Sequence, residues 1–353
     1  MSHFFGSHGH AMVGLDIGTR SVKGVLLTGK AEDVRLNACA CEYIQGNAFK
    51  ERDIDDYDAI STAIRKVQRQ LSTKVKEAAI AVSGSSVITK VIHMDPGLSD
   101  FELESQIEVE ADSLIPYPLD EVYVDFEELG ESRFYQGKVD VLLSAAHRDM
   151  VDKRVTLLRE LELEPKVVDV DGYALGTALL DFGPELADDE VLCCLNLGAS
   201  QLLVTAVQNG KVIYSKEHNF GFDNLVRDIA MMTGAEPFEV QAQLVGEGMD
   251  PHWREQTWPM FLSNLQQQVN RALQMFSASA SVAMPSSLLI CGGGANLPGL
   301  AGELSEDLNM DVKVFNPLAS LADKDDKQDT PLEGPQMTIA LGLASRSFKP
   351  WHI

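Results

Sequence analysis

The hydrophobic and polar positions of the first 82 residues alternate as in a small α/β layer. An apolar run from Val13 enters a tight turn and leaves as a second strand at 22–27, and a third strand is predicted at 35–43. Residues 58–71 carry apolar side chains at helical spacing, and a buried strand begins at Glu77. This order of strands and a helix favours an α/β architecture.

The pattern changes from Ser85 onward. A strand is predicted at 87–93, and Ser99 with Glu102 forms a capping-box sequence that opens a helix to about Leu114. Two prolines in 115–119 then stop that helix. Two strands at 121–128 and 138–146, a helix at 148–161, a strand at 166–170 and a helix from Asp171 to Leu180 follow. We therefore predict that residues 86–165 are inserted into the first domain.

The opening hairpin has a second copy 180 residues later. Leu15-Asp16-Ile17-Gly18 corresponds to Leu195-Asn196-Leu197-Gly198, and each stands between two strand-like runs. Repetition at this scale predicts two similar domains, whose hairpins would face one another across a cleft. A coincidence between two ordinary hairpins is the alternative.

The first turn carries groups that suit a phosphate and a divalent cation. Asp16 supplies a carboxylate, Gly18 allows close approach to backbone N–H groups, and Lys23 supplies an ammonium group. A carboxylate can hold the hydration shell of Mg²⁺ beside a phosphate. Taken alone, this turn is also compatible with a hairpin that binds nothing.

A third candidate stretch lies in the last quarter of the chain. After helix-like runs at 236–246 and 258–280, a buried strand from Ser287 ends in Gly292-Gly293-Gly294 and a new helix. Glycines at this junction let a flat ligand lie against the backbone, although a tight turn would need them too. A further helix is predicted at 337–345.

Composition narrows the class of protein. The 353 residues suffice for about two domains, and 45% are hydrophobic. No apolar run approaches the ~20 residues of a membrane span, and the first twelve residues lack the pattern of a signal peptide and look like a flexible lead. The five cysteines are odd in number and form no Cys-x-x-Cys pair, which favours a reducing cytoplasm over a disulfide framework.

The net charge of the chain argues against two further classes of protein. A net charge of −24 argues against a nucleic-acid binder and disfavours attraction to anionic lipid. Between Ser99 and Ser132 there are twelve acidic residues and no Lys or Arg. This block is either a solvated face or a surface that attracts a basic partner.

The motifs occur in the order of the actin, sugar-kinase and FtsA ATPase superfamily. More narrowly, the chain from 12 to 348 resembles the PilM family, the cytoplasmic actin-like proteins of type IV pilus assembly, and MshI-type pilus proteins are similar. Four stretches carry this resemblance: 82–90, 110–119, 166–175 and 342–348. It implies an α/β, actin-like (ribonuclease H-like) fold with two lobes and an FtsA-like inserted subdomain. The implied parts are a lead at 1–12, a first lobe at 13–85 and 166–187, an acidic insert at 86–165, and a second lobe at 188–353 with a smaller subdomain at 216–275.

The resemblance also implies a site for ATP or ADP with Mg²⁺. Asp171 would orient an attacking water, and Asp16 would hold Mg²⁺ through water. The residues expected at the nucleotide are Asp16, Gly18, Thr19, Ser21, Lys23, Asn196, Gly198, Ala199, Gly221, Glu239, Gly292, Gly293, Gly294 and Ala295.

Two departures from the superfamily affect the expected activity. Asn196 replaces an acid and cannot add a second negative charge near Mg²⁺. The helix that carries Glu239 lacks the usual downstream Lys. We expect turnover to be very slow, with nucleotide acting to stabilise or switch a scaffold.

The family resemblance implies an adaptor that binds the cytoplasmic tail of PilN, a bitopic membrane protein, beside the inserted subdomain. It also implies contacts with other platform proteins and the assembly ATPases, leaves self-association open, and places the protein in the cytoplasm, peripheral to the inner membrane. The alternatives are a slow ATPase or small-molecule kinase, and an FtsA-like membrane-tethered filament, for which the short C-terminal end leaves no amphipathic helix. The expected tail-binding residues are Glu108, Glu110, Asp112, Ile115, Tyr117, Leu119 and Tyr123.

Overall fold

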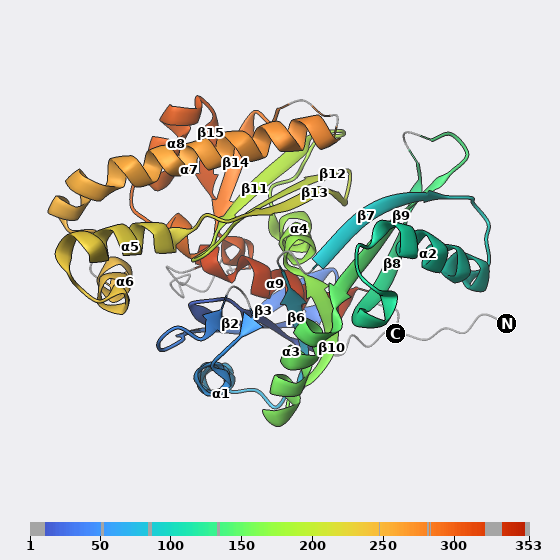
Figure 1. Ribbon diagram of the computed structural model, residues 1–353, viewed down its shortest axis with the longest axis horizontal. Coiled ribbons are helices and arrows are strands. Elements are labelled where there is room, and N and C mark those ends of the chain that lie inside the picture. The colour runs from blue at the N-terminus through green and yellow to red at the C-terminus, as the bar shows by residue number, and fades with distance from the viewer. Residues whose placement is uncertain are drawn as a thin grey trace. The chain divides into compact units, whose positions relative to one another are not determined.

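The computed structural model describes residues 11–50, 53–83, 87–132, 135–246, 248–280, 282, 284–321 and 334–349 (Figure 1). The chain forms two compact units, one at Val82–Glu162 and the other from the residues on either side of it. Most of the flexible lead predicted at 1–12, the loop 322–333 and the last four residues lie outside the described part of the chain.

The larger unit contains two five-stranded sheets of the same design. Their strand orders are β10-β6-β1-β2-β3 and β15-β14-β11-β12-β13. In each sheet a hairpin, β1 with β2 or β11 with β12, lies beside a parallel strand, β6 or β14. The repeat predicted from two short motifs therefore extends over both sheets. The bounds are β1 Val13–Ile17, β2 Ser21–Lys30, β3 Asp33–Tyr43, β6 Glu77–Val82, β10 Glu164–Val170, β11 Val191–Leu197, β12 Leu202–Gln208, β13 Lys211–His218, β14 Ser287–Cys291 and β15 Asp311–Val314.

Two central helices pack against each other between these sheets, α4 (Asp171–Phe182) and α9 (Thr338–Ser345) (Figure 1). Helix α9 packs on β1 and β2, and α4 packs on β12 and β13. Their approach is close because Gly342 has no side chain: a Cβ there would lie 1.9 Å from the carbonyl oxygen of Ala174. Burial of both apolar helices joins the cores of the two sheets.

Helix α7 is the longest of the remaining helices in the described part of the larger unit. Helix α7 begins seven residues before the predicted start at 258 and passes through Pro259. A proline inside a helix removes one hydrogen bond, and the first turns are held by a bond from the Thr257 hydroxyl to the carbonyl of Trp253 (2.8 Å) and by the burial of Trp258. The bounds are α1 Tyr57–Leu71, α5 Phe222–Thr233, α6 Pro237–Gly246, α7 Pro251–Ala280 and α8 Leu300–Leu308, with a ribbon of β4 Phe49–Lys50 and β5 Asp53–Ile54, and 3₁₀ turns η2 Gly293–Asn296, η3 Pro317–Ser320, η4 Gly334–Met337 and η5 Arg346–Phe348.

The smaller unit is a three-stranded antiparallel sheet, in the order β7-β9-β8, with helices α2 and α3. The predicted capping box is present, since the Ser99 hydroxyl accepts from the Glu102 N–H and the Glu102 carboxylate accepts from the Ser99 N–H. Helix α2 buries Leu103, Ile107 and Ala111 against one face of the sheet. The bounds are β7 Val87–Met94, α2 Asp100–Leu114, η1 Leu119–Glu121, β8 Val122–Glu131, β9 Val139–His147 and α3 Arg148–Glu160.

Among the helices of the described residues, none combines the length and the apolar character that a membrane crossing requires.

Candidate functional site

The first hairpin turns between β1 and β2 at Gly18, whose N–H donates to the carbonyl of Ser21 (3.1 Å). The register of the two strands places Asp16 opposite Lys23, and the Lys23 ammonium donates to the Asp16 carboxylate at 3.0 Å. Only 12% of the Asp16 side chain and 14% of the Lys23 side chain are exposed. The turn therefore holds a nearly buried pair of opposite charges next to a glycine.

The charge of Lys23 is maintained by its neighbours. Burial would lower the pKa of Lys23, but the charge of Asp16, with smaller contributions from Cys41, from the Asp16 hydrogen bond and from Asp171, raises it above its ordinary value. Asp171, the first residue of α4, contributes to this rise in the Lys23 pKa. Lys23 is thus a fixed cation in the stem of this hairpin, beside the turn.

The second hairpin repeats the turn of the first. The Gly198 N–H donates to the carbonyl of Gln201 (2.8 Å), as Gly18 does to Ser21. Its loop is bonded to the start of α5, because the Gly198 carbonyl accepts from Phe222 (3.0 Å) and the Ala199 carbonyl accepts from Asp223 (2.8 Å). A Cβ at Gly221 would lie 2.2 Å from the Ala199 carbonyl oxygen, so only glycine allows this packing.

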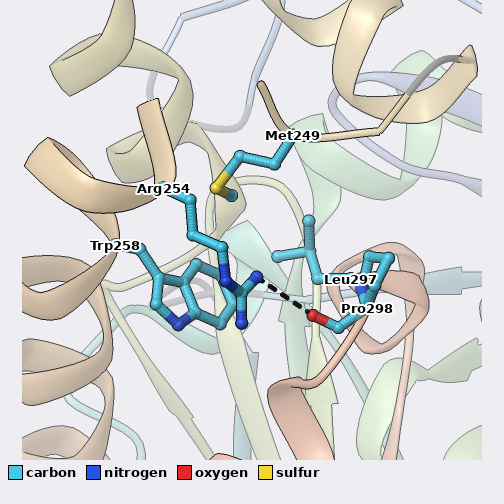
Figure 2. Close-up of a pocket in the computed structure, with 5 residues that line it drawn as sticks. All are labelled: Met249, Arg254, Trp258, Leu297 and Pro298. Atoms are coloured by element: carbon cyan, nitrogen blue, oxygen red, sulfur yellow. Dashed lines mark hydrogen bonds between the residues drawn. The ribbon is translucent and has the colours of Figure 1, made fainter. Parts of the chain in front are cut away.

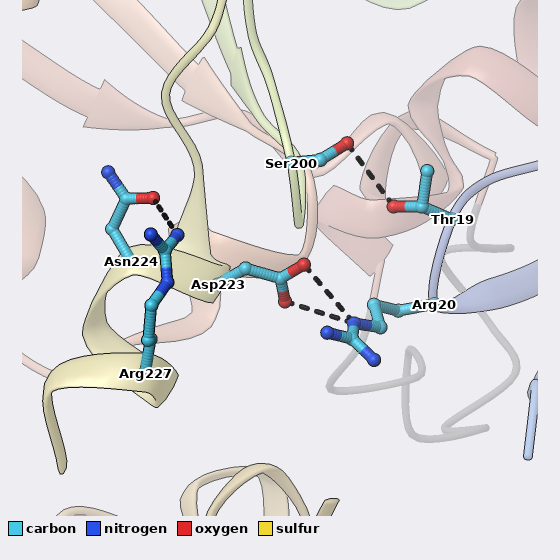
Figure 3. Close-up of polar contacts among 6 residues, drawn as sticks. All are labelled: Thr19, Arg20, Ser200, Asp223, Asn224 and Arg227. Atoms are coloured by element: carbon cyan, nitrogen blue, oxygen red, sulfur yellow. Dashed lines mark hydrogen bonds and ion pairs between the residues drawn. The ribbon is translucent and has the colours of Figure 1, made fainter. Parts of the chain in front are cut away.

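The tips of the two hairpins meet (Figure 3). The hydroxyls of Thr19 and Ser200 are 3.3 Å apart, and the Nε of Arg20 lies 3.1 and 3.2 Å from the two carboxylate oxygens of Asp223. The sequence prediction includes Thr19 but misses Arg20, Ser200 and Asp223. A signal for Arg20 and Ser200 was available, since the 180-residue repeat aligns them.

The glycine loop lies beside the second hairpin. Gly292 has a φ of +86°, and a Cβ there would lie 2.1 Å from the side-chain oxygen of Asn196. A Cβ at Gly294 would meet the side chain of Leu197 at 2.5 Å, whereas at Gly293 nothing lies closer than an atom at 3.8 Å. Two glycines thus pack the loop onto β11, and Gly293 leaves an open backbone surface.

A small cavity of about 80 Å³ borders the end of this loop at Leu297 and Pro298 (Figure 2). Arg254 donates to the Pro298 carbonyl (3.3 Å), and its guanidinium lies 4.8 Å from the centre of the Trp258 ring. Arg254 also forms an ion pair with Glu303, which accepts from the Trp258 ring N–H at 2.6 Å. These contacts fix the loop against α7 and α8. Met249 completes the lining.

These residues fit a nucleotide with Mg²⁺. The two turns offer glycine backbone at their tips, and Lys23 and Asp16 carry the charges that a phosphate and a hydrated cation need. Within the described residues, no cluster of three or more His, Cys, Asp or Glu side chains could hold a metal ion by itself. Such a site suits Mg²⁺ that takes most of its ligands from phosphate and water.

Contacts link most of the predicted nucleotide residues into one cluster. The first hairpin carries Asp16, Gly18, Thr19, Ser21 and Lys23, and Ser21 is buried. Glu239 is different: it is exposed in the first turn of α6, and its carboxylate accepts from the N–H of Glu236 (3.4 Å). Its proposed contact with the ligand therefore stays a prediction. The residues linked through the second hairpin and the loop are Asn196, Gly198, Ala199, Gly221, Gly292, Gly293, Gly294 and Ala295.

The predicted tail-binding residues do not all lie on one face of the smaller unit. Glu108, Glu110 and Asp112 are exposed on α2, but the structure corrects one expectation. Ile115 is only 4% exposed and belongs to the core, so it is not available as a surface anchor.

Tyr123 lies on the opposite face of the sheet from α2. Its strand neighbour is Ala146, which packs with α3, and its hydroxyl donates to Asp152 of α3 (3.0 Å). Alternation along β8 separates it from Val122, which joins the core under α2. Tyr117 and Leu119 are half-buried against that core.

Two large apolar side chains missed by the sequence prediction lie on the acidic helix. Phe101 and Val109 are 77% and 73% exposed. Phe101, Ser105 and Val109 are spaced four residues apart, so they share one face of α2, and this face is opposite Leu103 and Ile107. The helical period identifies them once Leu103 and Ile107 are known to be buried. The acidic face of the smaller unit therefore also offers apolar contact area.

Comparison with known proteins shows the family of this chain. The family model "Type IV pilus assembly protein PilM" matches residues 14–348. A chain in the solved structure of a PilM-PilN type IV pilus biogenesis complex is 25% identical, with a TM-score of 0.81 over 96% of this chain and 99% of that one.

More distant similarities are found to one curated sequence and one solved structure. The cell division protein FtsA of Bacillus subtilis (strain 168) is 20% identical over 351 residues, which covers 86% of this chain and 78% of FtsA. The ethanolamine utilization protein EutJ of Carboxydothermus hydrogenoformans is 15% identical, with a TM-score of 0.54 over 95% of this chain and 89% of EutJ. The predicted actin-like fold is confirmed, and the chain belongs to the PilM family of type IV pilus assembly proteins.

Proposed function

We propose that this protein is an actin-like, nucleotide-binding adaptor of the type IV pilus inner-membrane platform. In this role it binds the cytoplasmic N-terminal tail of a PilN-like membrane protein on its acidic unit, and it is held at the inner membrane through such partners. The observation that carries the proposal is the likeness, over nearly the whole of both chains, to a protein that was solved in a PilM-PilN complex. Other platform proteins and the assembly ATPases are further candidate partners.

The nucleotide would occupy the cluster of the two hairpins and the glycine loop. ATP or ADP with Mg²⁺ supplies the negative charge that Lys23 and the turn N–H groups bind, and Asp16 would hold the hydration shell of the cation. Asn196 offers an amide where a second acid would be needed. Asp171 would orient the attacking water, and we propose that hydrolysis is at most slow.

Charge complementarity supports the tail site. Helix α2 presents Glu108, Glu110 and Asp112 to solvent, and the stretch from Ser99 to Ser132 contains no cation. A basic tail would be attracted to this surface, and the half-buried Tyr117 and Leu119 supply apolar contact beside it. Tail recognition would therefore depend on salt concentration.

Reversing three of these charges tests the tail site. The triple variant Glu108→Lys, Glu110→Lys and Asp112→Lys should bind a basic, Leu/Pro-containing tail peptide at least tenfold more weakly, because attraction becomes repulsion at each position. Its affinity should also depend less on salt. Fluorescence anisotropy with the labelled peptide at several salt concentrations measures both effects.

The matched control carries the same charge change on the larger unit, at the exposed acids Glu255, Glu306 and Asp307. If both triple variants lose the same affinity, net charge alone explains the result and the tail site lies elsewhere. Calorimetry with Mg-ATP, in the presence and absence of the peptide, separates the adaptor from a kinase or ATPase. Peptide binding without turnover is the result expected of an adaptor.

A further inference from the structure

The two hairpins are tied by an ion pair of unusual position. Arg20 lies at the tip of the first hairpin, and Asp223 is in the first turn of α5, the helix to which the second hairpin is bonded. The residues are 203 positions apart in the chain, and their side chains are 26% and 21% exposed. The pair therefore joins the two halves of the proposed nucleotide site directly.

In this ion pair, Arg20 contacts Asp223 through only one of its three guanidinium nitrogens. Both hydrogen bonds to Asp223 are made by the Nε of Arg20, at 3.1 and 3.2 Å, and Figure 3 draws no bond from either terminal nitrogen of Arg20 to that carboxylate. A guanidinium binds an oxyanion most strongly through two parallel N–H groups. A partly exposed pair held through one nitrogen is weak enough to be exchanged for a stronger anion.

Arg20 also differs from the other cation of the hairpin. Lys23 lies in the stem and is held by Asp16 at 3.0 Å, whereas Arg20 occupies the turn itself, between Gly18 and Ser21. A phosphate carries more negative charge than a carboxylate and offers more acceptor oxygens, so it would compete well for a guanidinium in this position.

We infer that Arg20 is a phosphate ligand of the nucleotide site and that Asp223 competes with the phosphate for it. This inference rests on the proposed nucleotide binding and adds a residue to it. In the absence of nucleotide, the pair ties the first hairpin to α5; with nucleotide, Arg20 turns to the phosphate and releases Asp223. Occupancy of the site is thereby coupled to the link between the hairpin and the helix.

A double-mutant cycle tests this competition. Asp223→Asn should raise the affinity for Mg-ATP several-fold, because the freed guanidinium no longer has to leave a carboxylate. Arg20→Ala should lower that affinity about tenfold, the loss of one charged contact. In the Arg20→Ala background, Asp223→Asn should have no effect. Calorimetry with Mg-ATP and Mg-ADP gives the four affinities, and circular dichroism melts show whether each variant is folded.

The control is Arg227→Ala, because this exposed arginine lies one turn further along α5 and bonds to Asn224 at 3.0 Å. It removes the same charge near the site and should leave the affinity unchanged. A fall in affinity for Asp223→Asn would overturn the inference, since Asp223 would then serve the nucleotide itself. An equal rise with and without Arg20 would also overturn it, because the effect would be general charge repulsion.

Absence of nucleotide binding in both the wild-type protein and Asp223→Asn would refute the inference and the nucleotide part of the proposed function together. The tail-peptide measurement would still decide the adaptor role. Normal nucleotide binding with an unchanged affinity in all variants would refute the inference alone.

Discussion

Lys23→Met should lower the free energy of unfolding by about 2 kcal/mol and weaken Mg-ATP binding by about tenfold to a hundredfold. The stability loss follows because the Asp16 carboxylate, only 12% exposed, would lose the ammonium that it contacts at 3.0 Å. The affinity loss follows because a charged contact to phosphate contributes roughly 1.5–3 kcal/mol. Urea unfolding and calorimetry measure the two effects separately.

The double variant Lys23→Met with Asp16→Asn separates folding from binding. Removing both charges should restore most of the lost stability, because no unpaired buried carboxylate remains. Nucleotide binding should stay weak, since both the phosphate contact and the Mg²⁺ contact are gone. As a control, Lys313→Met breaks the exposed pair with Asp311 (2.6 Å), and it should change stability by less than about 0.5 kcal/mol. A double variant as unstable as the sum of its single variants would contradict the paired-charge explanation.

The two hairpins were accessible from the sequence because they depend on local chemistry. Asp16 and Gly18 mark a turn between two apolar runs, and Asn196 and Gly198 mark its copy. Since strand, turn and strand are adjacent in the chain, their pairing follows from the pattern of side chains alone. The capping box at Ser99 is local in the same way, and it is present in the structure.

Contacts between residues that are far apart in the chain could not be predicted from the sequence. Nothing near Arg20 in the sequence indicates Asp223, because their approach depends on how the two sheets and α5 are packed. The sequence prediction groups Tyr123 with Ile115, but β8 places Tyr123 on the face of its sheet opposite α2. One residue of register along a strand decides the face, and the sequence prediction did not apply that alternation.

Burial also separates residues that look alike in sequence. Ile115 and Phe101 are both apolar residues of the acidic stretch, yet one is 4% exposed and the other 77%. Phe101 lies on the face of α2 opposite the buried Leu103, whereas Ile115 directly follows α2 and packs in the same core as Leu103. The helical period indicates the exposed face only once the buried face is known. Partner sites on a charged helix are therefore best predicted from the ridge opposite its core.

The close contact of α4 and α9 predicts the largest loss of stability. Gly342→Ala should lower the free energy of unfolding by about 3 kcal/mol, because the added Cβ would lie 1.9 Å from the Ala174 carbonyl oxygen and 3.3 Å from the Ala178 nitrogen. The obstructing atoms are helix backbone, so no side-chain rotation relieves the overlap. The two helices would have to move apart and open the core between the sheets. Urea unfolding, followed by circular dichroism, measures the change.

Gly302→Ala provides the matched control. Gly302 is also inside a helix, α8, but a Cβ there would meet nothing within 4 Å. Since alanine favours a helix over glycine by about 1 kcal/mol, this substitution should stabilise the protein slightly. The two glycine-to-alanine changes should therefore have opposite signs, and the difference between them isolates the helix–helix contact from helix propensity. If Gly342→Ala were as stable as the control, α4 and α9 would have to tolerate a wider separation, and the two sheets would not share a tightly packed core at this point.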